Sequence, residues 1–158
     1  MSLYCGLSYE EVVRRYAPAV HSVCVMRLSG HADADDCFQN VFLKLYRSKT
    51  DFTGPDHVKH WLLRVTINAC KKAALSPWRR MEPIETCAEA FQMPSAEHAE
   101  LLDAVMRLKP KYRTAIYLHY YEGCSTQEIA KLLGVPQNTV LTHLRRARQA
   151  LKEELTEV

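Results

Sequence analysis

Residues 125–150 constrain the fold more strongly than any other part of this 158-residue chain. Ser125 followed by Glu128 is a capping-box pattern, in which each side chain satisfies a backbone N–H at the start of a helix. Gly134 can adopt the left-handed conformation that ends a helix, and Pro136 suits the first turn of a following one. The segment therefore predicts a short helix, a tight turn and a second helix.

The second of these helices has two chemically different faces. Its inward stripe is apolar, and its opposite side is polar and basic without any acidic residue between Glu128 and Glu153. Carboxamide, hydroxyl and guanidinium groups are what base edges and phosphates require. A generic antiparallel helix pair can share this pattern, but cap, turn and one-sided basic face together favour a DNA-binding helix-turn-helix. The stripe is Val140, Leu144, Ala147 and Leu151, and the polar face is Asn138, Thr142, Arg145, Arg146 and Gln149.

The net charge of +3 conceals a block pattern. Residues 57–80 contain bases and no acid, residues 81–103 contain acids and no base, and residues 109–152 are again mostly basic. This alternation predicts two polyanion-binding surfaces joined by a solvated connector. No apolar run is long enough to span a bilayer, and the N-terminal residues do not resemble a signal peptide, so we expect a cytoplasmic protein.

The remaining chain predicts helices throughout. Residues 8–28 have helical apolar spacing, with Pro18 introducing either a kink or a break into two helices. Residues 33–47 form a cleaner helix with Asp33 as its cap, and residues 48–55 form a loop. Residues 57–75 form the next helix, with an inward stripe of Val58, Trp61, Leu62, Val65 and Ala69.

A proline- and glutamate-containing segment separates this region from the helix-turn-helix. Its composition is typical of a flexible linker, which we place at residues 79–95. Helices over residues 96–108 and 111–121 then complete a four-helix C-terminal domain. The sequence thus predicts an all-α protein with two small helical domains, residues 1–78 and 96–158.

Two exposed faces of the N-terminal domain have open interpretations. The helix over residues 33–47 leaves Leu43 among polar groups, which marks either a partner surface or a single exposed leucine of no consequence. The helix over residues 57–75 has an acid-free face that is either a nucleic-acid surface or simply solvated. Its residues are His60, Arg64, Asn68, Lys71 and Lys72.

The residues that carry catalysis or bind metals in other proteins form no recognisable motif. The six cysteines are scattered without a closely spaced pair, which indicates free thiols rather than a structural zinc site. His57 and His60 lie three residues apart, but no cysteine or carboxylate lies near them on the same helix face, so no metal is assigned. The five glycines form no phosphate-binding loop, and no hydrolase or metalloprotease motif occurs, so we expect neither a cofactor nor an enzyme.

Three segments in register resemble the extracytoplasmic-function (ECF) sigma factors of bacterial RNA polymerase. They are DADDCFQNVFLKLYR, WLLRVTINACKKAAL and KPKYRTAIYLHYYEGCSTQEIAKLLGVPQNTVLTHLRRARQALKEEL, and with the linker they cover roughly residues 8–155. The resemblance implies a protein that binds core polymerase, through the β′ coiled coil and the β flap, and directs it to promoter DNA. It also implies regulation by an anti-sigma factor inserted between the two domains.

The resemblance assigns roles to residues. The helix over residues 33–46 would dock on the β′ coiled coil, and the loop over residues 48–56 with the following helix would recognise and melt the −10 element. The second helix of the helix-turn-helix would recognise the −35 element. Docking is implied for Asp35, Asp36, Gln39, Asn40, Leu43 and Lys44, and −10 contacts for Arg64, Asn68, Lys71 and Lys72. Contacts with the −35 element are implied for Gln137, Asn138, Thr139, Thr142, His143, Arg145, Arg146 and Arg148.

Two other classes of protein remain as alternatives. A conventional helix-turn-helix regulator would bind an operator as a dimer, using residues 1–80 to sense a signal or to dimerise. A redox or metal sensor would use the scattered cysteines, which the spacing disfavours. Tight duplex binding without polymerase would distinguish the first alternative, and metal content or oxidation-dependent binding the second.

Overall fold

The computed structural model describes residues 4–28, 31–74 and 99–156. Within these ranges the secondary structure is helical, apart from one isolated bridge between Tyr4 and Leu7 that closes a small N-terminal turn. The predicted all-α fold is confirmed. The predicted linker, residues 79–95, lies outside the described residues.

Three mutually packed helices form an N-terminal module: α1 (Tyr9–Arg27), α2 (His31–Arg47) and α3 (Pro55–Ala74). Ser8 and Glu11 cap α1 with a reciprocal capping box. Pro18 lies inside α1, which remains a single helix, so the predicted break into two helices does not occur. Buried side chains from all three helices form the core, including Val12, Val20, Val41, Leu45 and Leu62.

Two predicted helix starts need correction. We expected Asp33 to cap α2, but the helix begins at His31 and Asp33 lies in its first turn. There its carboxylate still meets the positive end of the helix dipole. We also placed Pro55 in the preceding loop, whereas it is the first residue of α3, a position where its missing N–H costs nothing.

The buried face of α3 is wider than its apolar stripe predicted. Val58 and Leu62 are buried as expected, but Trp61, Val65 and Ala69 are only partly buried. Full burial extends instead to residues on the neighbouring side of the helix. Among them, Cys70 bonds to Cys24 of α1 and Cys37 of α2, so the packing of α3 on these two helices contributes to the wider buried face. These residues are Leu63, Thr66, Ile67 and Cys70.

Four helical segments form the predicted C-terminal module: α5 (Ala99–Met106), α6 (Pro110–Ile116) with its π-helical continuation η2 (Tyr117–Tyr121), α7 (Thr126–Leu133) and α8 (Gln137–Thr156). The π-helical turn replaces the regular end predicted for the helix over residues 111–121. At its end the backbone N–H of Glu122 bonds to the carbonyl of Tyr117 at 3.1 Å, and Gly123 follows with a φ of 70°.

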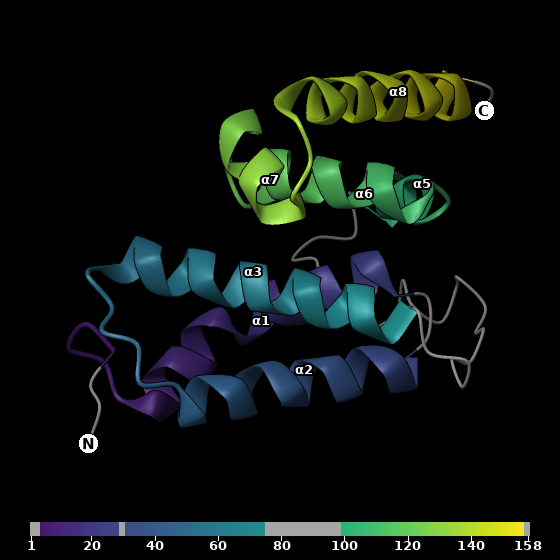
Figure 1. Ribbon diagram of the computed structural model, residues 1–158. Coiled ribbons are helices and arrows are strands. Elements are labelled where there is room, and N and C mark those ends of the chain that lie inside the picture. The colour runs from purple at the N-terminus through teal and green to yellow at the C-terminus, as the bar shows by residue number, and fades with distance from the viewer. Residues whose placement is uncertain (1–3, 29–30, 75–98, 157–158) are drawn as a thin grey trace.

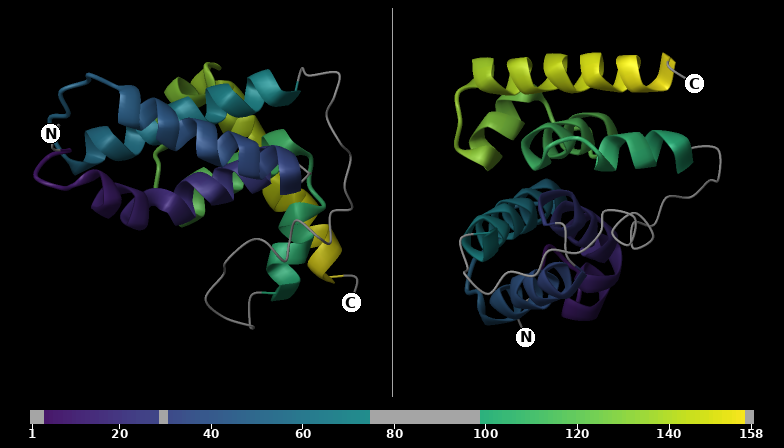
Figure 2. Two further views of the ribbon diagram at one scale, coloured as in Figure 1. Left: turned by 90° about the horizontal axis from the view of Figure 1, so that it is seen from below. Right: turned by 90° about the vertical axis from the view of Figure 1, so that its right-hand side faces the viewer.

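The two modules form stacked layers (Figure 1). Helices α5–α7 lie between α8 and the N-terminal module, so α8 is the outermost layer, as the right-hand view of Figure 2 shows. Contacts between the modules run from α1 to α6 and from α3 to α7. This stacking leaves α8 free on its outer side and brings α3 against the first helix of the helix-turn-helix.

Candidate nucleic-acid and polymerase interfaces

The helix-turn-helix forms as the local sequence dictates. Ser125 is extended, and its Oγ accepts a hydrogen bond from the backbone N–H of Glu128 at 3.1 Å, which caps α7. Gly134 has a φ of 69°, the left-handed conformation that ends α7, and its N–H bonds to the carbonyl of Ala130 at 2.9 Å. The predicted cap and turn are therefore confirmed.

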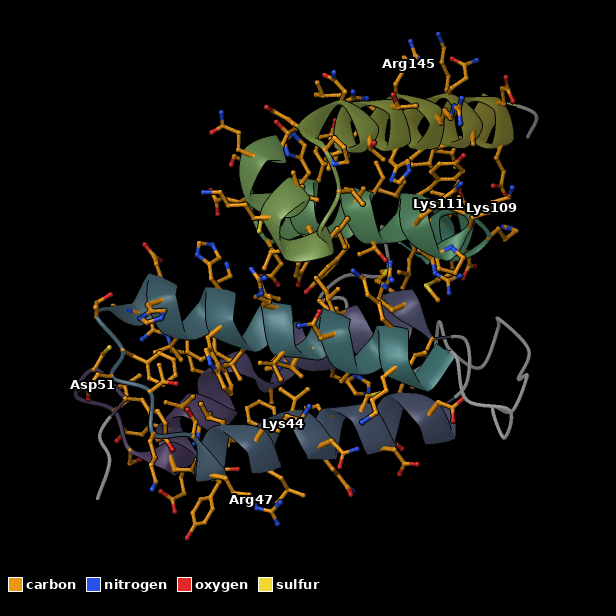
Figure 3. The ribbon with its side chains drawn as sticks, in the orientation of Figure 1. Lys44, Arg47, Asp51, Lys109, Lys111 and Arg145 are labelled. Atoms are coloured by element: carbon orange, nitrogen blue, oxygen red, sulfur yellow. The ribbon has the colours of Figure 1, made fainter. Side chains whose placement is uncertain are left out.

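As predicted, α8 has an apolar inner side and a polar outer side. The apolar stripe of Val140, Leu144, Ala147 and Leu151 is buried against α6 and α7. On the outer side, Asn138 and the guanidinium-bearing residues of the helix are exposed, and Arg145 points away from the rest of the molecule in Figure 3. The predicted −35 residues that are exposed are Gln137, Asn138, Arg145, Arg146 and Arg148, whereas Thr139, Thr142 and His143 are partly buried.

Several of these side chains are held by neighbours in the same module. The guanidinium of Arg148 donates to the hydroxyl of Tyr120 at 2.5 Å, and the carboxamide of Gln137 donates to Thr126 at 2.8 Å. The guanidinium of Arg146 bonds to Tyr112 and lowers the pKa of that phenol. Such contacts fix flexible side chains, which reduces the entropy that a surface loses when it binds a ligand.

His143 differs from the other predicted −35 residues. Its ring packs edge-on against Tyr112, with ring centroids 5.5 Å apart, and its Nδ1 is buried without a hydrogen-bond partner. Burial and the nearby charges of Lys111 and Arg146 lower the pKa of this imidazole. The lowered pKa favours the neutral form of the His143 ring, which can form hydrogen bonds but carries no charge.

The predicted −10 residues of α3, Arg64, Asn68, Lys71 and Lys72, are all exposed. One of them also contacts the C-terminal module: the ammonium of Lys71 donates to the carbonyl of Leu133 at 2.7 Å, at the C-terminal end of α7. Part of this predicted DNA-binding face is thus occupied by the C-terminal module.

The predicted polymerase-docking residues lie along α2. Asp36, Asn40, Leu43 and Lys44 line a groove of about 490 Å³ between α2 and α3, and Lys72 lines the same groove. Asp35 and Gln39 are exposed on α2 outside that groove. Arg47, on the same helix, lies at the edge of the molecule opposite Arg145 (Figure 3).

An arginine that we had counted among the polyanion-binding charges is instead buried between the modules. Arg113 of α6 is 2% exposed, and its Nε donates to the carbonyl of Met26 in α1 at 2.5 Å. Its Nη1 donates to the carbonyls of Met106 and Leu108 at 3.0 and 3.3 Å. Nothing in the local sequence distinguishes this arginine from a surface one, because its acceptors come from distant segments.

Two further polar contacts join α3 to the C-terminal module. The ammonium of Lys59 lies 3.0 Å from the carboxylate of Glu122 and also donates to its backbone carbonyl at 3.1 Å. The imidazole of His60 lies 2.8 Å from the carboxylate of Glu128. Partial burial raises the pKa of Glu128, but hydrogen bonds from Ser125 and the proximity of His60 outweigh it and lower the pKa overall.

The cysteines in the described residues are free thiols, as expected, and Cys87 lies outside those residues. Cys24, Cys37 and Cys70 come from α1, α2 and α3 and are all buried. The bond with Cys70, together with burial, raises the pKa of Cys37 far above its usual range. The pKa of Cys70 is also raised, by its bond with Cys24 and by burial, although its bond with Cys37 acts in the opposite direction. Cys37 and Cys70 are therefore structural core groups rather than nucleophiles.

Comparison with known proteins agrees with the division of the chain into two helical modules. Residues 12–80 match the family model for sigma-70 region 2, and residues 98–151 match that for sigma-70 region 4. The RNA polymerase sigma-E factor of Streptomyces antibioticus is 30% identical over 94% of this chain and 85% of its own length. The ECF RNA polymerase sigma factor SigE of Mycolicibacterium smegmatis is 31% identical, and the chain spans 62% of its length.

Solved structures share the fold. The sigma factor RpoE of Bartonella quintana, in complex with the anti-sigma factor NepR, has a TM-score of 0.72 at 22% identity and covers 94% of this chain. CnrH, in complex with the cytosolic domain of CnrY, has a TM-score of 0.64, also at 22% identity.

The chain belongs to the ECF sigma factors, the family of RNA polymerase sigma factors that its segments resemble. In the described parts of the chain, no helix combines the length and apolar content needed to cross a membrane.

Proposed function

We propose that this chain binds core RNA polymerase and directs it to promoters by recognising two DNA elements, one with each module. The observation that carries the proposal is the pair of acid-free basic faces, on α8 and α3, located in the two regions that match sigma-70 regions 4 and 2. We assign residues 1–78 to polymerase docking, −10 recognition and melting, and residues 96–158 to −35 recognition.

In this proposal the start of α8 enters the major groove of the −35 element. Gln137, Asn138 and Thr142 supply carboxamide and hydroxyl groups for base edges, with Thr139 and the neutral His143 beside them. Arg145, Arg146 and Arg148 contact phosphates. The rigid placement of Arg148 on Tyr120 and of Gln137 on Thr126 supports a preformed recognition surface.

The loop over residues 48–54 and α3 recognise and open the −10 element. Several contacts hold this loop: Cys5 Sγ lies 3.2 Å from the carbonyl of Phe52, and the backbone N–H of Thr53 donates to His57 at 3.1 Å. Phe52 packs edge-on against Trp61, with centroids 5.8 Å apart. A fixed loop of this kind can hold an unstacked base, while Arg64, Asn68, Lys71 and Lys72 contact the opened strand.

Docking on polymerase uses the exposed side of α2. Asp35, Asp36, Gln39, Asn40 and Lys44 surround Leu43, which is 48% exposed, so charge and an apolar anchor occur on the same surface. The mixed face suits the β′ coiled coil, and the C-terminal module would contact the β flap. Action on polymerase places the protein in the cytoplasm, and its own residues need no catalytic chemistry.

Polymerase allows two weak DNA-binding modules to bind with high specificity together. Each module alone would bind mainly through phosphates, with little sequence preference. Held at fixed positions, the two modules recognise two short elements at a defined spacing. The contacts of α3 with α7 must break first, because they hold the C-terminal module against the end of α3 where Lys71 bonds to Leu133. An anti-sigma factor that stabilises this arrangement would keep the chain inactive.

Run-off transcription with purified core polymerase and a library of random promoters tests this function. We expect initiation that depends on the chain, from templates sharing two elements at one spacing. Tight duplex binding without polymerase, combined with no new transcripts in its presence, would instead indicate an operator-binding regulator and contradict the proposal.

A further inference from the structure

Three metal-ligating side chains meet where α3 contacts the start of α7. His60, Cys124 and Glu128 each present one ligand atom, and the three atoms all lie within 4.8 Å of one another. His60 belongs to the N-terminal module, whereas Cys124 and Glu128 belong to the C-terminal module. The cluster therefore exists only while the two modules are in contact.

The three ligand types suit Zn²⁺. Zinc binds thiolate, imidazole and carboxylate at about 2.0–2.3 Å, which places tetrahedral ligand atoms roughly 3.3–3.8 Å apart. Nε2 of His60 and the nearest oxygen of Glu128 are now 2.8 Å apart, so they need to separate only slightly. Mg²⁺ and Ca²⁺ prefer oxygen ligands alone, which disfavours them here. A thiolate and a carboxylate with a neutral imidazole also balance the charge of a divalent ion.

The surroundings fix the ligands and leave a path for an ion. Cys124 is 3% exposed, its backbone N–H donates to the carbonyl of Leu118 at 2.9 Å, and its carbonyl lies 2.9 Å from Nδ1 of His119. The cap on α7 fixes the backbone of Glu128. The side chains of His60 and Glu128 are each 43% exposed, so an ion can enter and a water can occupy the fourth position.

We propose that His60, Cys124 and Glu128 form a Zn²⁺ site that bridges the two modules and holds the α3 face against α7. On binding, the Cys124 thiol gives its proton to solvent, bonds form from zinc to sulfur, nitrogen and oxygen, and the His60–Glu128 contact is replaced. Since the site is complete only when the modules touch, zinc stabilises that arrangement by mass action. That this restrains −10 recognition rests on the proposed function.

Binding can be measured directly with Co²⁺ as a spectroscopic probe of the full chain, under anaerobic reducing conditions. We expect one Co²⁺ per chain, with a thiolate-to-cobalt charge-transfer band and the visible bands of tetrahedral cobalt, displaced by Zn²⁺. Cys124→Ser should abolish the charge-transfer band. His60→Ala should weaken affinity at least about 100-fold, beyond the 10–100-fold typical for loss of an outer-shell partner.

His57→Ala is the matched control, because His57 lies on the same helix but outside the cluster. It should bind Co²⁺ as the unmodified chain does. His60 is partly exposed on the module opposite Cys124, so its removal leaves the folded surroundings of the thiol intact. No charge-transfer band, or a band that His60→Ala leaves unchanged, would overturn the bridging site.

Transcription separates this inference from the proposed function. With core polymerase, Zn²⁺ should reduce initiation by the unmodified chain several-fold more than initiation by His60→Ala. Metal binding without any transcription in either chain would contradict the proposed function but leave the site standing. If the unmodified chain binds the metal but Zn²⁺ reduces initiation equally for it and for His60→Ala, the proposed restraint on α3 would be overturned.

Discussion

The outer face of α8 and the exposed face of α3 have the same side-chain chemistry but different availability. Both carry Arg, Lys or Asn residues without acids, and the sequence predicts nucleic-acid binding for both. The face of α8 is open, with Arg145 pointing outward, whereas Lys71 on α3 is bonded to the end of α7. Composition thus indicates what a face can bind, and tertiary packing decides whether it can do so.

The contact made by Lys71 shows how the C-terminal module pairs with a cation that we propose for DNA binding. Leu133 is the last residue of α7, where unpaired carbonyls carry the negative end of the helix dipole. This helix end offers Lys71 the kind of partner that a phosphate would offer. Lys59 has an equivalent partner in Glu122. In the proposed function, the interface between the modules would therefore compete with DNA for the α3 face.

Among these predictions, removing Arg113, the buried arginine between the modules, should have the largest effect on free energy. Arg113→Ala deprives three buried carbonyls, on Met26, Met106 and Leu108, of their donor and leaves a cavity. We expect a loss of about 3–5 kcal/mol in the free energy of unfolding, measured by urea denaturation.

Arg107→Ala is the control for that measurement. Arg107 forms an ion pair with Glu154 at 2.7 Å, and its side chain is 53% exposed. Exposed pairs contribute little, so its loss should cost less than about 1 kcal/mol. Equal losses in the two variants would show that Arg113 does not anchor the modules.

The success of the sequence predictions depended on the range of the interaction. Ser125 and Gly134 are local signals, decided within a few residues, and both behave as predicted. Arg113 entered the sequence analysis only as part of the basic block over residues 109–152, and its burial was not predicted because its acceptors lie in α1 and in the α5–α6 connection. The same reason hid the His60–Cys124–Glu128 cluster, because His60 is far in the sequence from the closely spaced Cys124 and Glu128.

In the free chain, removing a cation from the α8 face should weaken DNA binding more than removing one from the α3 face. Arg145→Ala should weaken binding to a duplex containing the −35 element roughly tenfold, about 1.4 kcal/mol, and reduce the salt slope by about 1. Lys71→Ala should not weaken the binding of a −10 single strand by the free chain, because the Lys71 ammonium is already paired with Leu133 there. With polymerase present, Lys71→Ala should weaken that binding. Weaker binding by Lys71→Ala in the free chain would show that the α3 face is already open.

Weakening the contact between the modules should make the α3 face more available to DNA, and so more like the α8 face. Glu122→Gln removes the charge that pairs with Lys59 at 3.0 Å, and we expect a shift of about 0.5–1 kcal/mol toward separated modules. The free chain should then bind a −10 single strand roughly two- to fivefold more tightly, measured by fluorescence anisotropy. Glu154→Gln, which breaks an ion pair within the C-terminal module, is the matched control and should leave this affinity unchanged.

The smallest effect concerns His143 on the α8 face. Its lowered pKa means that the folded chain binds fewer protons here than the unfolded chain, whose imidazole has a pKa of about 6.5. The stabilisation is complete above that value and is lost as the pH falls through the folded pKa. NMR titration of the ring should give a pKa below 6.5. A raised pKa would contradict burial of the ring against Tyr112.

The distance between the modules tests the central claim most directly. Fluorophores on noncanonical amino acids at Glu10 of α1 and Lys131 of α7, both exposed, would report it by single-molecule energy transfer without touching the cysteines. We predict one short distance in the free chain and a distinctly longer one on core polymerase, as the α3 face is released from α7. The same distance in both states, or separated modules in the free chain, would contradict the account.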